Sequence, residues 1–109
     1  MWTVRFTDEA FQEYQALPDR ERAAMAEAIN KLKAIGPNLG APHSSRVQGV
    51  KATIRELRPR RGSSPWRAFY RRVGDQFVIA SVGPEAEQNN RGFQRAVDRA
   101  IARLSEIEV

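Results

Sequence analysis

The sequence contains no cysteine and a single histidine among its 109 residues. The missing thiols exclude a disulfide framework, a thiolate nucleophile and a cysteine-ligated zinc site, and one imidazole excludes a metal centre built from several histidines. No segment approaches the roughly 20 consecutive apolar residues that a membrane-spanning helix needs. The opening stretch MWTVRFTDEA lacks the basic region and apolar run of a signal peptide. We therefore expect a soluble, cytoplasmic protein with no membrane partner.

The chain is short for an enzyme that carries a cofactor. Its length suits one compact domain, residues 1–109, with a single core. No room is left for a cofactor-binding domain beside a substrate-binding domain. We therefore expect neither a metal nor a small-molecule cofactor.

Acidic residues are scarce in the middle of the chain. Between residues 46 and 72, eight arginines and one lysine stand against a single carboxylate, Glu56. A solvated sheet face is one explanation, but the planar arginine fork matches phosphate oxygens and favours a phosphate-binding role. The nine cations are Arg46, Lys51, Arg55, Arg58, Arg60, Arg61, Arg67, Arg71 and Arg72.

Hydrophobic periodicity predicts a short strand in residues 1–6 and then two helices. Thr7 is the expected N-cap of the first helix, with Phe6 and Phe11 as a hydrophobic staple, and Pro18 ends it. The second helix is expected over 19–35 and is followed by a loop at 36–49. Three strands come next, and a helix capped near Asn89 or Asn90 closes the chain. The expected strands are Val50–Arg58, Pro65–Val73 and Gln76–Val82, the last two joined by a tight turn at Gly74 and Asp75.

This order predicts an α+β fold: a small antiparallel sheet with an N-terminal helical hairpin on one face, and a C-terminal helix. Side-chain alternation along the strands brings four residues together on the sheet face that the helices leave open, while Tyr70 packs in the core. On that face, fixed cations would hold a phosphodiester or stabilise charge developing on it. The four residues are Glu56, Arg58, Arg67 and Arg71.

Four arginines also recur at four-residue spacing along the last predicted helix. This spacing places them on one side of the helix, opposite its apolar stripe. A solvated helix face and a surface that contacts RNA or a partner protein both fit the pattern. The four are Arg91, Arg95, Arg99 and Arg103.

The helical hairpin, the loop GPNLGAP, the strands IRELR and WRAFY, the strand end ASVG and the closing amphipathic helix resemble, in this order, a known family. The family is the RelE/HigB superfamily of bacterial type II toxins, and the phage-derived HigB-like branch is the most similar part of it. The resemblance implies the RelE-like fold and a basic endoribonuclease that cuts mRNA in the ribosomal A site. Attack of the 2′-hydroxyl on the neighbouring phosphorus would cleave the strand. A cognate antitoxin protein would bind and neutralise the toxin.

The resemblance also implies site residues. Arg67 and Tyr70 match the arginine and tyrosine of the family's R-x-x-Y strand, and Glu56 and Arg58 match its E-L-R strand. His43 joins these four as a catalytic candidate because an imidazole titrates near neutral pH, although an ordinary surface histidine fits the same loop. The expected RNA-binding residues are Arg46, Lys51, Arg60, Arg61, Arg71 and Arg91.

The sequence departs from the family after SVG, where a basic run gives way to PEAEQNN, with Glu85 and Glu87 in place of cations. Either Arg91, Phe93, His43 or Arg46 substitutes for the missing groups, or Glu85 acts as a base, or the nuclease is weak or absent. The alternative function is therefore a non-catalytic toxin fold. Such a protein would inhibit gyrase as ParE toxins do, or would only bind its antitoxin. A general RNA-binding domain fits less well because an aromatic stacking platform is missing.

Overall fold

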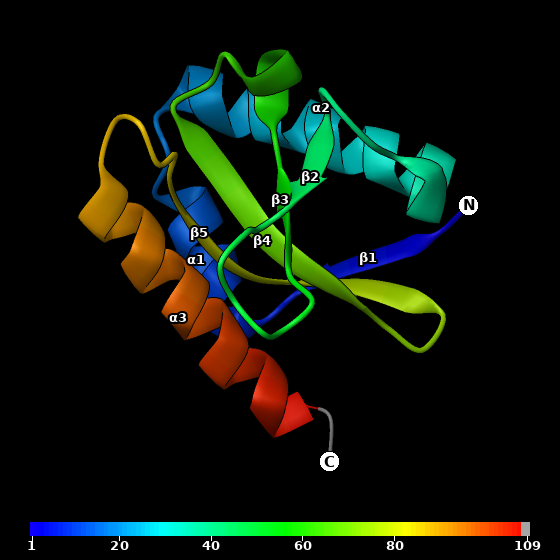
Figure 1. Cartoon of the computed structure of the whole chain (residues 1–109). Coiled ribbons are helices and arrows are strands. Elements are labelled where there is room, and N and C mark those ends of the chain that lie inside the picture. The colour runs from blue at the N-terminus through cyan, green and yellow to red at the C-terminus, as the bar shows by residue number, and fades with distance from the viewer. Residues whose placement is uncertain (108–109) are drawn as a thin grey trace.

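The computed structural model describes residues 1–107 and contains five strands and three α-helices there (Figure 1). Two short 3₁₀ turns, η1 (Gly36–Asn38) and η2 (Pro59–Gly62), lie between these elements. None of the helices within these residues combines the length and apolar character needed to cross a bilayer. In chain order the elements are β1 (Thr3–Phe6), α1 (Asp8–Gln15), α2 (Asp19–Ile35), β2 (Ser44–Arg46), β3 (Arg55–Leu57), β4 (Trp66–Val73), β5 (Gln76–Pro84) and α3 (Asn90–Ile107).

The strands form one sheet in the order β1-β5-β4-β3-β2. The sheet is mixed rather than antiparallel as predicted, because β1 pairs with β5 in parallel while the other pairs are antiparallel. Strand β2 lies in the segment predicted as a loop, where three residues pair with β3. The predicted strand Val50–Arg58 is shortened to β3, since the preceding residues form the connection from β2. The β4–β5 hairpin and its turn at Gly74 are confirmed.

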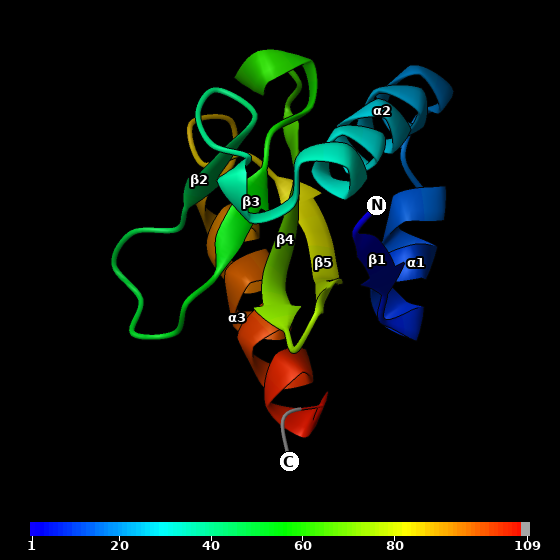
Figure 2. The ribbon, with the colours of Figure 1, turned by 90° about the vertical axis from the view of Figure 1, so that its right-hand side faces the viewer.

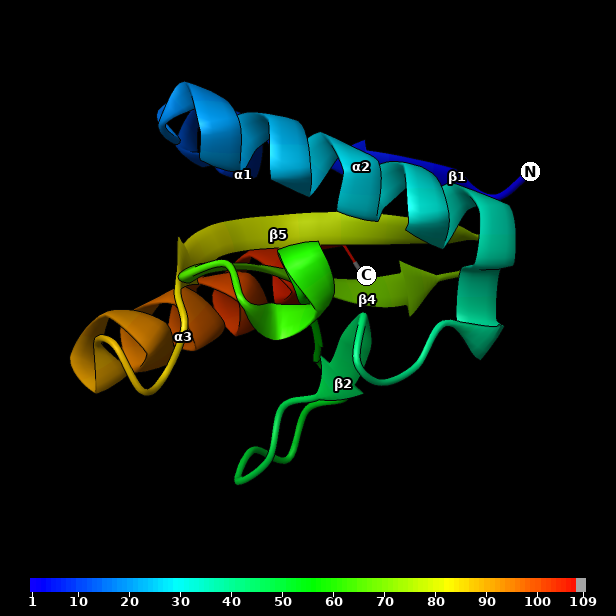
Figure 3. The same ribbon diagram turned by 90° about the horizontal axis from the view of Figure 1, so that it is seen from above.

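Helices cover both faces of this sheet. Helices α1 and α2 lie on one face, and α3 lies on the other (Figures 2 and 3). In one core, side chains of α1 and α2, including Met25 and Leu32, pack against Leu57, Tyr70 and Ile79 of the sheet. The second core joins the apolar stripe of α3 to the opposite side chains of the sheet, Ile54, Phe69, Val78 and Ala80. The face expected to be open for arginines is therefore covered by α3, because Phe69 and Val78 require an apolar partner there.

The predicted N-caps of α1 and α3 are confirmed by their hydrogen bonds. The backbone N–H of Ala10 donates to Thr7 Oγ1 at 3.1 Å, and the rings of Phe6 and Phe11 pack with centroids 5.5 Å apart as the staple requires. At α3, the N–H of Gly92 donates to Asn89 Oδ1 at 2.9 Å, which identifies Asn89 as the cap. These local signals set where the helices begin.

A side-chain clamp joins α1 to α3 around the edge of β5. The carboxylate of Glu13 accepts the backbone N–H of Val82 at 3.0 Å and Arg103 Nη2 at 3.0 Å, while Arg99 Nε lies 3.4 Å from it. Arg103 Nη1 also donates to the carbonyl oxygen of Ala80 at 2.8 Å. Two members of the predicted arginine series thus hold α3 in place, and the other two, Arg91 and Arg95, are exposed.

Candidate nucleic-acid interface

The turn after β3 has an unusual backbone. Arg60 and Arg61 have φ angles of 54° and 58°, in the left-handed region, and Gly62 follows with φ 94°. For a residue with a Cβ, this conformation costs roughly 1–2 kcal/mol. Backbone strain of this kind persists only where surrounding contacts enforce it, and such places are frequently functional. Residues Pro59–Gly62 therefore form a defined turn between β3 and β4.

Contacts with the start of α2 hold this turn. The Arg60 guanidinium donates to both carboxylate oxygens of Glu21, at 3.0 and 2.8 Å, and to the carbonyl oxygen of Arg20 at 3.1 Å. Ser64 Oγ donates to the same Glu21 carboxylate at 2.7 Å. These hydrogen bonds, that of Arg60 first, hold the pKa of Glu21 below its ordinary value. The predicted RNA-binding residue Arg60 therefore uses its charge within the protein.

Arg67 holds the turn from the sheet side. Its guanidinium donates to the carbonyl oxygens of Ser64 at 2.7 Å, Trp66 at 3.0 Å and Gly62 at 3.2 Å. The side chain is only 3% exposed, so its predicted place on an open sheet face is wrong. Burial, followed by repulsion from Arg58, lowers the pKa of Arg67, but an arginine remains charged at any physiological pH.

Two carboxylates balance the charge of Arg67. Glu56 Oε1 lies 3.4 Å from Arg67 Nε, and Glu85 Oε2 lies 4.0 Å from Arg67 Nη2. Glu85 is one of the acidic residues that replace the expected basic run, so the sequence departure after Gly83 supplies a partner for a buried arginine. Arg58 Nη1 donates to the same Glu56 oxygen at 2.7 Å. Three of the four residues predicted to group, Glu56, Arg58 and Arg67, are therefore in contact, and Glu56 and Arg67 are both buried.

Arg58 is the accessible member of this group. Its side chain is 30% exposed and lies against Gly62, where an added Cβ would sit 2.7 Å from Arg58 Nη2. The glycine thus serves two needs, a positive φ and a close approach by the guanidinium. Arg58 bridges the buried Glu56 and the surface.

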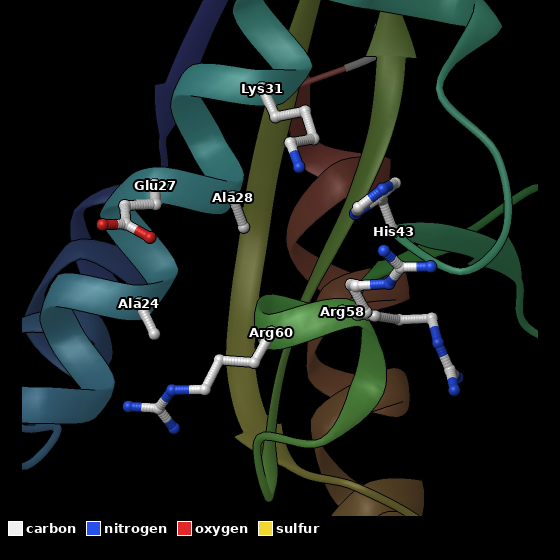
Figure 4. A pocket seen from close by; sticks show the side chains of 8 residues that line it. Ala24, Glu27, Ala28, Lys31, His43, Arg58 and Arg60 are labelled. Carbon is white, nitrogen blue, oxygen red and sulfur yellow. The ribbon is translucent and has the colours of Figure 1, made fainter.

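A cleft of about 170 Å³ opens between α2 and this turn. Figure 4 shows side chains entering it from α2, from the loop before β2 and from the turn after β3. Five basic side chains line it, accompanied by one carboxylate, Glu27. A cleft lined by cations attracts anions and suits phosphate oxygens in particular. The five are Lys31, His43, Arg58, Arg60 and Arg61.

His43 differs from the other four because it can change charge near neutral pH. Partial removal from water, followed by repulsion from Lys31 and Arg61, lowers the pKa of His43 from its ordinary value of 6.5. The imidazole is therefore neutral at pH 7 and is able to accept a proton. The cleft combines a proton acceptor with groups that bind phosphate.

The remaining predicted residues lie outside the cleft. Tyr70 is in the core, as its strand position predicts, and its hydroxyl shares a hydrogen bond of 2.5 Å with Ser44 Oγ. Arg46 and Lys51 are exposed at and after β2, and Arg91 is exposed in the first turn of α3. Arg71 is half-buried near the end of β4.

Sequence reasoning missed Lys31, which α2 contributes to the cleft. A signal was present, since Ala24, Ala28 and Lys31 follow one another at helical spacing and all line the cleft. Two small side chains on that side of the helix leave room beside the turn. The three residues read as an ordinary stretch of a core-facing helix until the facing turn is known.

Comparisons with known proteins match this fold. The free form of an arginine-to-alanine double mutant of Escherichia coli RelE aligns with TM-score 0.62 and 20% identity, over 90% of this chain and 96% of the RelE chain. The RelBE2 toxin–antitoxin complex of Mycobacterium tuberculosis aligns with TM-score 0.59 and 25% identity, over 77% of this chain and 98% of that one. The Staphylococcus aureus YoeB dimer aligns with TM-score 0.57 and 18% identity, over 73% and 92%. No curated protein matches this chain in sequence.

The family comparison covers most of the chain. The model of the family described as phage derived protein Gp49-like matches residues 12–105, from the middle of α1 almost to the end of α3. That range includes the cleft, the strained turn and the Glu56–Arg67 pair. The chain therefore belongs to the phage-derived Gp49-like family and has the fold of the RelE toxins.

Proposed function

We propose that this protein is the toxin of a type II toxin–antitoxin system, of the HigB-like kind, and that it cleaves mRNA on the ribosome in the cytoplasm. The observation that carries the proposal is the cleft, in which a neutral histidine lies among lysine and arginine side chains on a RelE-type fold. RNA supplies its own nucleophile, the 2′-hydroxyl. The protein has to supply proton transfer, positioning and charge stabilisation.

The cleft residues fit these requirements. His43 takes the proton of the 2′-hydroxyl as its oxygen attacks the adjacent phosphorus. The bond from phosphorus to the 5′-oxygen breaks, leaving a 2′,3′-cyclic phosphate, and the Lys31 ammonium donates a proton to the departing 5′-oxygen. Arg58 and Arg61 bind the non-bridging oxygens, whose negative charge increases in the transition state.

The proposed partner is an antitoxin protein. Two of the structural relatives are toxins in complex with RelB antitoxins, from M. tuberculosis and from Pyrococcus horikoshii. For this chain, we propose an antitoxin with an acidic segment that covers the cationic cleft and excludes RNA. Charge complementarity of this kind increases the association rate, and this increase becomes smaller as the salt concentration rises.

Expression without an antitoxin tests the proposal. Primer extension is performed on one transcript in a translated form and in a form without a start codon. We expect cuts in the translated form only. His43→Gln should reduce cleavage by about 10²-fold or more, as for loss of a general base. Arg61→Asn should also reduce it, because asparagine tolerates positive φ but carries no charge.

The matched control is Arg95→Gln, which removes one exposed arginine from α3. It should cleave like the wild type. Equal cleavage by wild type and His43→Gln would contradict the assignment of the cleft as the reaction site, and uncut RNA in arrested cells would contradict the proposed reaction.

The second candidate function is a non-catalytic toxin fold. The observation that favours it concerns Arg67, which matches the family's strand arginine. The guanidinium of Arg67 is already bound by carbonyl oxygens and lies beside two glutamates, so it is not available to an RNA phosphate. The same expression experiment separates the two. Growth arrest with intact mRNA supports a gyrase-type target, and normal growth supports a protein that only binds its antitoxin.

A further inference from the structure

A second hollow lies near the opposite end of β3. Its volume is about 280 Å³, and it borders Pro37, which follows α2. We call it the arginine pocket. Three arginines, one threonine and two aromatic residues line it: Arg55, Arg71, Arg72, Thr53, Tyr70 and Phe77.

Two of the arginines are held in position by the protein. Arg55 Nε donates to Ser44 Oγ at 2.9 Å, and Ser44 is in turn hydrogen-bonded to the hydroxyl of Tyr70. Arg72 Nε donates to the carbonyl oxygen of Gly74 at 2.9 Å, and its guanidinium carbon lies 4.9 Å from the centre of the Trp2 ring. Fixing Nε sets the plane of each guanidinium and directs its terminal nitrogens. Less entropy is lost when such a preorganised group binds an anion.

The wall of the pocket is aromatic. Tyr70 and Phe77 meet edge to face with ring centroids 5.8 Å apart, and both rings belong to the core shared with α2. They make the wall rigid and are themselves almost fully buried, 1% and 4% exposed. Among residues 1–107, the lining contains no aspartate or glutamate. The pocket therefore offers positive charge beside an apolar wall, which suits a ligand with an anionic part and a flat apolar part.

We propose that the arginine pocket binds one nucleotide of single-stranded RNA, with the phosphate on Arg55 and Arg72 and the base stacked on a guanidinium plane above the buried aromatic residues. Base stacking on arginine planes and aromatic rings, combined with phosphate contacts, is how proteins hold single strands. The identity of the ligand as RNA rests on the proposed function.

Binding of a non-cleavable RNA tests this site separately from catalysis. We would measure the fluorescence anisotropy of a labelled eight-nucleotide 2′-O-methyl RNA with the full-length protein. Thr53→Glu places a carboxylate among the arginines at an exposed position, so we expect it to leave folding intact. It should weaken binding about tenfold. Arg55→Gln should weaken binding and reduce the salt slope by about 0.7 for the lost phosphate contact.

The matched control is Gln94→Glu, which adds the same charge at an exposed position of α3. It should bind RNA like the wild type. Equal affinity of Thr53→Glu and Gln94→Glu would overturn the proposal, and so would an unchanged salt slope for Arg55→Gln. If RNA binding does not depend on Arg55 and an acidic peptide binds to the pocket instead, the occupant is a protein segment and the nucleotide proposal is wrong.

The result of this RNA-binding experiment does not depend on nuclease activity. If the wild type binds the RNA through this pocket but cuts no transcript, the proposed cleavage fails and the pocket stands. If the wild type cuts translated mRNA but the pocket variants bind RNA normally, the pocket fails and the proposed function stands.

Discussion

Replacement of Arg67 by alanine should destabilise the fold by several kcal/mol rather than only inactivate the protein. The substitution leaves three carbonyl oxygens without their donor and the nearly buried Glu56 without one of its two arginine partners. Removing one member of a buried ion pair costs about 3–5 kcal/mol. A domain of this size has about 5–15 kcal/mol of stability in total. Each kcal/mol corresponds to roughly 4–8 °C in Tm, so we expect a decrease of about 15 °C or more.

Urea unfolding followed by far-ultraviolet circular dichroism measures this effect. Arg95→Ala, an exposed arginine-to-alanine change on α3, is the control and should alter stability by less than about 0.5 kcal/mol. In a double-mutant cycle, Arg67→Ala and Glu56→Ala should cost less together than the sum of the single changes, because the two residues share one interaction. An Arg67→Ala protein with the wild-type urea midpoint would refute the structural role of this arginine.

Three further predictions follow from other contacts. Gly83→Ala places a Cβ 2.5 Å from that of Ala96; it should cost about 1–3 kcal/mol in urea unfolding, and Ala96→Gly in the same chain should recover part of this. Glu21→Gln should cost about 1 kcal/mol at pH 7. The pKa of Glu21 in the folded state lies below its ordinary value of 4.5, so the stability that this carboxylate contributes is complete above pH 4.5. That contribution is lost as the pH falls through the folded-state pKa. The difference in urea midpoint between the wild type and Glu21→Gln should therefore vanish in acid. His43 is the sole histidine, so its imidazole gives one set of NMR signals; they should titrate below pH 6.5, and Lys31→Gln should raise the midpoint.

Local features of the fold were predictable because their physical causes are local. The Thr7 cap, the Phe6–Phe11 staple and the glycine turn after β4 each depend on residues within a few positions of one another. Residues 77–82 are apolar except for Ser81 and show no polar alternation, which is typical of a strand covered on both faces. They lie between two helical layers in β5, as a strand covered on both faces must.

The error at Arg67 arose from the choice of face, not from the strand alternation. Arg67 and Phe69 do share a face, as alternation requires, and Phe69 already indicated that this face needs an apolar cover. The stripe of α3 supplies that cover, with Phe93 packed edge to face on Phe69 at 5.3 Å. Which helix covers which face depends on how the chain crosses the sheet, and residue spacing carries little information about that. The cleft was missed for the same reason, because Lys31 and His43 meet only through tertiary packing.

The clamp at Glu13 has a consequence for the order in which the chain can fold during synthesis. Glu13 and Arg103 are separated by 90 positions. A ribosome releases the chain from its N-terminus, so Glu13 emerges 90 residues before Arg103. Until α3 has been made, the second face of the sheet, including Phe69 and Val78, has no cover. Native structure in this protein therefore has to wait for α3, and a nascent or truncated chain that ends before residue 90 exposes an apolar sheet face to chaperones and proteases.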